Sequence, residues 1–172
     1  MLLAVVFGVV DSVIKGNGGG IRSAIGNMSA PWLLLPFAAA TIAGSRRVLH
    51  GAWIGLVVSV VALASFYFAN TVVLQLGPHP WLVDLGLTVE GGKRFFVLAL
   101  ITGPVFGGLG AWWTNSRSLF APLLVAALFV LEPGVAVLYG APGTGIVWLA
   151  EILVGLLGAL LVIGLSRRPN IN

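Results

Sequence analysis

The chain has 172 residues, of which 59% are hydrophobic and only 8% are charged, and its formal net charge is +4. A soluble domain carries roughly 25% charged residues, so this chain cannot cover a water-facing surface, and we expect an integral membrane protein. The nine Lys and Arg residues flank apolar runs, as is usual in multi-pass membrane proteins, and do not indicate binding to nucleic acid. The absence of cysteine excludes disulfides and thiolate metal ligands.

Six apolar runs predict an all-α integral membrane protein, a six-transmembrane-helix bundle that forms one domain over residues 1–172. The first two helices, 1–14 and 31–44, are short, since about 14 residues give roughly 21 Å of helix and a span needs about 20 residues. The longer helices are expected at 48–76, 95–113, 119–139 and 146–165. Glycine and proline turn signals predict loops at 15–30 and 76–92.

Basic residues set the expected orientation. If all six helices cross, one set of loops and ends carries Arg46, Arg47, Arg117, Arg167 and Arg168. The other set carries Lys15, Arg22, Lys93 and Arg94. By the positive-inside rule we expect the loops and ends of the first set to face the cytoplasm. Both termini are then cytoplasmic, and we expect the protein in the inner (plasma) membrane of the cell.

Small residues four positions apart indicate where helices pack, because helix association in lipid depends on close approach of backbones. These residues are Gly51, Gly55, Gly103, Gly107, Gly155 and Ala159. The spacing marks helix faces that meet other parts of the protein, and plain bundle packing explains it.

Three acids lie in apolar runs: Asp11, Glu132 and Glu151. A charge at membrane depth costs roughly 2.5–3.5 kcal/mol or more, so it normally points into the bundle or a wet cavity. Glu132 and Glu151 are predicted at comparable depth in the outer half of consecutive helices. With Trp148 and Tyr139 as aromatic walls, they can form a site for a cation or a polar ring, and Asn70 can line the same cavity.

Structural explanations stand beside this one. Asp11 can pair with Lys15 at a helix end. Glu132 can be a protonated group that bonds the carbonyl freed by Pro133, and Glu151 can bond a neighbouring helix. Asn70, with Tyr67 and Ser59, can bond between helices.

Motifs for catalysis are missing. There is no H-E-x-x-H, G-x-S-x-G or Walker lysine, and the only histidines, His50 and His79, are predicted on opposite sides of the membrane. We therefore assign no catalytic residue, no metal site and no cofactor, and an enzyme is the least favoured class.

Two resemblances add expectations. The stretch "SAPWLLLPFAAATIAGSRRVLHGAWIGLVV" (29–58) resembles a family of uncharacterised small actinobacterial multi-pass membrane proteins, which supplies no site residues. The architecture, with a Gly-rich first outer loop, is similar to S components of energy-coupling-factor transporters. That resemblance implies an outward-facing small-molecule site and docking on a coupling subunit. The first helix departs from that class, since it is short and offers only Ala4 and Gly8 at the docking spacing.

The sequence therefore predicts a membrane protein that binds or transports a small molecule or cation through an outward-facing pocket, as an S-component-like transporter subunit. The alternative is an accessory or scaffold subunit of a larger membrane complex with no ligand of its own. The expected partners are the lipid bilayer, the ligand and other membrane subunits.

Overall fold

The computed structural model describes residues 1–16, 20–73, 79–138 and 144–166, and these contain helices and no strand. The helices are α1 (Leu2–Lys15), α2 (Ile21–Ile25), α3 (Ala30–Ile42), α4 (Val48–Phe68), a π-helical turn (Ala69–Val73), α5 (Trp81–Ser116), α6 (Phe120–Leu138) and α7 (Gly145–Ser166). The all-helical prediction is confirmed. Four helices, α4 to α7, are long and apolar enough to cross a membrane.

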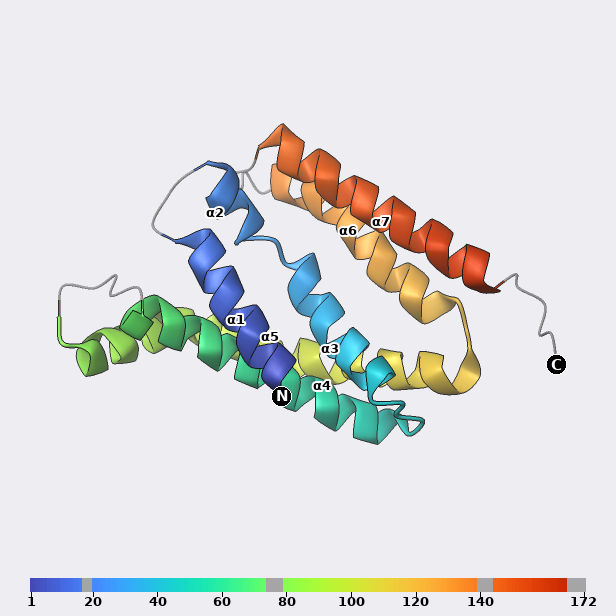
Figure 1. The fold of residues 1–172 in the computed structure, drawn as a ribbon, viewed down its shortest axis with the longest axis horizontal. Coiled ribbons are helices and arrows are strands. Elements are labelled where there is room, and N and C mark those ends of the chain that lie inside the picture. Colours follow the sequence, from blue (N-terminus) through green and yellow to red (C-terminus); the bar gives the residue numbers. More distant parts are fainter. Residues whose placement is uncertain (17–19, 74–78, 139–143, 167–172) are drawn as a thin grey trace.

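Two groups of helices make up the molecule (Figure 1). α4 and α5 pack along each other, and α1 and α3 lie against them. α6 and α7 form a hairpin beside α3. The main apolar cluster joins the two groups, since Phe37 of α3 and Phe106 of α5 pack with Val125 and Phe129 of α6.

Glycine lets α4 and α5 touch backbone to backbone. A Cβ atom added at Gly55 would lie 2.1 Å from the Gly103 carbonyl oxygen, and one at Gly107 would lie 2.2 Å from the Gly51 carbonyl oxygen. The structure thus brings together the four glycines that the sequence placed on two packing faces. Such close approach replaces the hydrophobic driving force that is missing between helices in lipid.

The same device joins α7 to α6 and α1 to α4. A Cβ at Gly155 would lie 2.7 Å from the Ala126 carbonyl oxygen, and Ala159, one turn further along α7, is half-buried. A Cβ at Gly8 would lie 2.1 Å from the Ala62 carbonyl oxygen, so α1 is held tightly against α4.

The prediction of a loop over 76–92 is wrong from Trp81 onward, because α5 begins there and runs for 36 residues. At 1.5 Å per residue this is about 54 Å, far more than the roughly 30 Å hydrocarbon core of a bilayer. The first turns of α5 carry charged residues. Asp84 stabilises the start of the helix, because its carboxylate accepts a hydrogen bond from the backbone N–H of His79 (3.1 Å) and contacts the Nδ1 atom of the His79 ring (2.9 Å).

Smaller corrections concern two other segments. The predicted loop 15–30 contains the short helix α2. The expected helix 48–76 is α-helical to Phe68 and then turns π-helical from Ala69 to Val73, whereas 74–76 lie outside the described residues. A π-turn widens the helix, and such turns are frequent at functional sites.

Candidate functional site

A cavity of about 530 Å³ opens at one end of the α1, α3, α4 and α5 group. α1 ends at this cavity, α3 begins there, and the π-turn after α4 closes one side. Its volume falls within the range of about 300–1,000 Å³ that is typical of small-molecule sites. Polar lining residues include Asp11, Lys15, Ser59, Asn70, Thr88 and Thr102.

Aromatic rings form the inner wall of this cavity, which we call the large cavity. A mainly apolar groove of similar volume, about 580 Å³, lies between α1, α4, the π-turn and α5. Trp32 meets Phe66 edge to face with 5.9 Å between ring centroids, and Phe66 meets Tyr67 in the same way at 5.4 Å. Tyr67 also lies against Gly92, where an added Cβ would be only 2.1 Å from the phenol oxygen. The rings are therefore held in fixed positions by one another and by the backbone of α5.

Asp11 and Lys15 supply opposite charges to the large cavity. The Asp11 carboxylate and the Trp32 ring both line the cavity, and the Asp11 Oδ2 atom is buried without a hydrogen-bond partner among the described residues. The Lys15 ammonium lies 5.5 Å from the centre of the Phe66 ring, within cation–π range. One acceptor atom in this cavity thus has no donor from the part of the chain that the structure describes, and a polar ligand group can supply one.

The neighbouring backbone is fixed by side chains from other segments. Ser12, which is fully buried, donates a hydrogen bond to Asn70 Oδ1 at 3.1 Å, so α1 is tied to the π-turn. Arg22 of α2 donates to the carbonyl oxygens of Val13 (2.8 Å) and Ile14 (3.2 Å). Because the last carbonyls of a helix lack partners within it, Arg22 both caps α1 and keeps α2 beside the cavity.

Glu132 holds the start of α3, a contact that the sequence did not predict. Its Oε1 atom accepts a hydrogen bond from the backbone N–H of Ser29, and its Oε2 atom accepts one from Ala30 at 2.6 Å. These N–H groups start α3, where Ser29 makes no side-chain cap of its own. Glu132 thus replaces the missing cap from 103 residues away. This contact differs from one predicted alternative, in which Glu132 bonds the carbonyl freed by Pro133.

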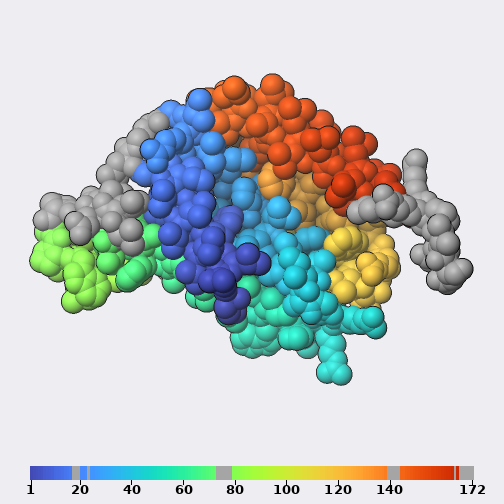
Figure 2. Space-filling view, in the orientation of Figure 1, coloured from blue at the N-terminus to red at the C-terminus, as the bar shows by residue number. Residues whose placement is uncertain are grey.

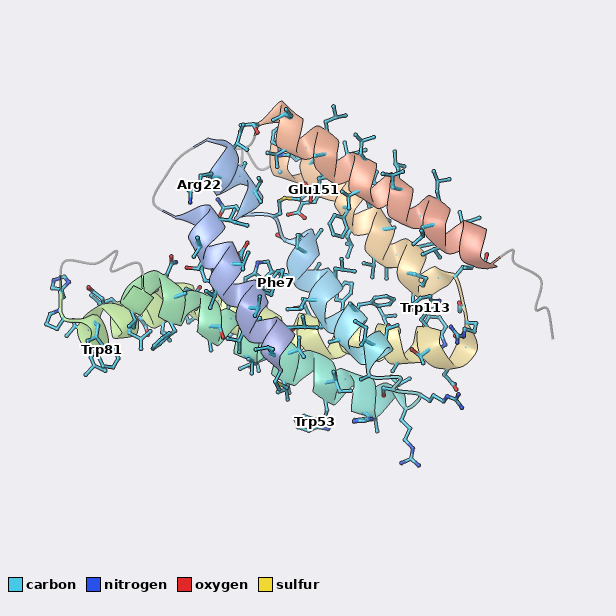
Figure 3. The ribbon with its side chains drawn as sticks, viewed as in Figure 1. Phe7, Arg22, Trp53, Trp81, Trp113 and Glu151 are labelled. Carbon is cyan, nitrogen blue, oxygen red and sulfur yellow. The ribbon has the colours of Figure 1, made fainter. Side chains whose placement is uncertain are left out.

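Glu151 lies against Glu132 and is almost completely buried, with 2% of its surface exposed. The carboxyl group of Glu132 is its charged neighbour, and its Oε1 atom is buried without a hydrogen-bond partner among the described residues. Glu151 also lines a second cavity of about 300 Å³ between α2, α6 and α7, which we call the small cavity. Figure 3 shows Glu151 projecting from α7 toward α2 and the start of α3.

The predicted site residues therefore divide between two places. The structure brings Glu132 and Glu151 together, and Trp148 is half-buried one turn before Glu151 on α7. Asn70 lines the large cavity, along with Tyr67 and Ser59. Tyr139 lies outside the described residues. Met28, just before α3, lines both cavities.

Sequence reasoning gave Asp11 mainly a local structural role and did not connect it with Trp32. One sequence signal could have linked Asp11 to the interior of the bundle. Gly8 marks the face of α1 that meets α4, and Asp11, three positions later, lies one turn further along the edge of that face. The joining of this face to Trp32 depends on tertiary packing.

No protein-family model, no curated protein and no solved structure matches this chain. The resemblances to the actinobacterial family and to S components therefore stay predictions.

Proposed function

We propose that this chain is a multi-pass membrane protein that binds a small organic molecule in the large cavity as the ligand-binding part of a transporter. The observation that carries the proposal is the unpartnered Asp11 Oδ2 atom inside a cavity of about 530 Å³ with aromatic walls. A ligand with an amino or other donor group can satisfy this oxygen. The rings of Trp32 and Phe66 suit a flat apolar body.

The proposed orientation places six helices across the plasma membrane, with α1 and α3 as short spans. The large cavity lies at the end of the bundle opposite Arg46, Arg47 and Arg117, which are at the α3–α4 and α5–α6 turns. By the positive-inside rule these turns face the cytoplasm. The large cavity then opens to the outside, and the first turns of α5 stand beyond the hydrocarbon core.

Retention of a ligand tests the proposal. The protein is extracted gently into nanodiscs and examined by native mass spectrometry, followed by denaturation to release bound molecules. We expect a released molecule that is neither lipid nor detergent. Asp11→Asn should weaken its retention by about 10–100-fold, because a hydrogen bond to a charged group contributes about 1.5–3 kcal/mol.

Glu90→Gln is the matched control, because Glu90 is an exposed carboxylate paired with Lys93 at 2.5 Å and does not line the large cavity. Release of lipid and detergent only, or equal retention by the Asp11→Asn and wild-type proteins, would contradict the proposal. Co-purification with another membrane protein and no small molecule would favour the scaffold alternative instead.

A further inference from the structure

The small cavity borders a buried side chain that has an unused acceptor atom. Glu151 is 2% exposed, and its Oε1 atom has no hydrogen-bond partner among the described residues. Figure 3 shows this side chain projecting from α7 toward α2, and residues of both helices line the small cavity. Buried polar atoms are normally hydrogen-bonded, so this oxygen is an acceptor for a donor group that enters the cavity.

The rest of the small cavity is apolar. α2 contributes Ile21 and Ile25, and α6 contributes the ring of Phe129. Met28 lies before α3, and the other lining residues of α7 are aliphatic. A single polar anchor in apolar surroundings is the arrangement that fixes one end of a mainly apolar ligand. The small cavity is therefore suited to an amphiphile, a molecule with one polar head and an alkyl body.

The rim of the small cavity is apolar and exposed. Ile21, Ile146 and Val154 are 52%, 65% and 55% exposed, and only 17% of the apolar window of α7 is buried in the protein. With α7 across the bilayer, this rim borders lipid and the entrance faces the membrane. Glu151 lies about 9 Å along the helix from Gly145, which is near the boundary where the heads of amphiphiles lie.

Charge selects the kind of head group. The described parts of α6 and α7 carry one ionisable side chain each, Glu132 and Glu151, and α3 carries none. The guanidinium of Arg22 on α2 is bonded to carbonyl oxygens of α1, and no salt bridge joins Glu151 to a cation within the described ranges. Buried carboxylates are normally paired, and charge-assisted hydrogen bonds are the stronger ones. A cationic donor therefore fits this site better than a neutral one.

We propose that the small cavity is a second binding site, which takes a cationic amphiphile from the bilayer. The ammonium group donates to the Glu151 carboxyl group, and the alkyl chain lies between α2 and α7. This ligand differs from the flat molecule proposed for the large cavity. The inference rests on the multi-pass placement of the proposed function, and it does not depend on what the large cavity binds.

Photolabelling of the full chain in nanodiscs tests the site. The probe is decylamine with a diazirine at the far end of its chain, and its amine is charged at neutral pH as that of lysine is. Peptide mapping by mass spectrometry should place the label on α2 and α7 residues of the small cavity. Glu151→Gln should lower this labelling about 10–100-fold, since a bond between two charged groups is lost. Glu90→Gln should not, because this exposed carboxylate lies outside the small cavity.

A pair of neighbouring variants on α7 tests the cavity without changing Glu151. Ala150 is exposed and lines the small cavity, so Ala150→Phe should fold and fill the space that the alkyl chain needs. Leu149 is exposed and does not line it, so Leu149→Phe is the matched control. Labelling in the small cavity should be lost in the first variant and kept in the second. Equal labelling of the two variants would overturn the proposal.

Competition by unlabelled molecules tests the charge of the head. Decylamine should displace the probe, whereas decanol, which has the same chain and a neutral head, should do so at least tenfold more weakly. Equal displacement by both would overturn the cationic head, and label spread evenly over the exposed faces of α5 and α7 would overturn the site itself. Asp11→Asn should leave the labelling unchanged, so failure of the large-cavity proposal and failure of this one are distinguishable.

Discussion

The close crossing of α4 and α5 gives a sharp stability prediction for Gly107→Ala. The new Cβ would lie 2.2 Å from the Gly51 carbonyl oxygen and 2.7 Å from the Gly55 Cα atom. Both are backbone atoms, so the helices must separate by about an ångström to restore ordinary contact. Overpacking of this kind costs about 1–3 kcal/mol, which corresponds to a fall of roughly 3–9 °C in the melting temperature.

Gly108→Ala is the matched control on the next residue. Its Cβ would lie 3.3 Å from a methyl carbon of Val48, and a side chain can move by the few tenths of an ångström required. Both variants gain the same intrinsic helix propensity, which therefore cancels in the comparison. Each protein is heated in one detergent, and the monodisperse fraction is measured by size-exclusion chromatography. Equal melting temperatures for the two variants would refute the backbone-contact argument.

Two further pairs of variants test other contacts in the same assay. Gly92→Ala should lower the melting temperature by several degrees, because its Cβ would meet the Tyr67 phenol oxygen at 2.1 Å, whereas Gly91→Ala has open space; no difference between them would refute the Tyr67 contact. Gly155→Ala should destabilise the α6–α7 hairpin by about 1–3 kcal/mol, whereas Gly158→Ala has nothing within 4 Å of its Cβ. A Gly158→Ala variant that is the less stable of that pair would refute the packing assigned to α7.

The apolar runs were enough to predict the helical class and most helix positions, because both depend on local sequence. The start of α5 was missed for a physical reason. In a sequence pattern, Gly86 and Gly91 indicate the end of a helix. In the structure, Cβ atoms added at these two positions would meet nothing, so both glycines lie on the exposed surface of α5. At such positions glycine destabilises a helix by only about 1 kcal/mol relative to alanine. Pro80 is the N-cap of α5, so it begins the helix at a position where proline is compatible with helix geometry.

The candidate site was predictable only in part. The positions of Glu132 and Glu151 on consecutive helices were enough to predict that the two residues are neighbours. The partners of Glu132, the N–H groups of Ser29 and Ala30, lie over a hundred residues away in the chain, and no local pattern marks such a partner. The large cavity likewise arises where α1 meets α4 across Gly8, and that crossing is a tertiary feature.

The long-range cap on α3 also has a consequence for the order of assembly during synthesis. α1, α3, α4 and α5 are all made before Glu132 leaves the ribosome, so the first N–H groups of α3 must wait without their final acceptor (Figure 1). Figure 2 shows α2 and α3 on one face of the molecule with the C-terminal helices beside them. A nascent chain that ends after α5 therefore has an uncapped α3, and this helix end gains its acceptor only when α6 has been made.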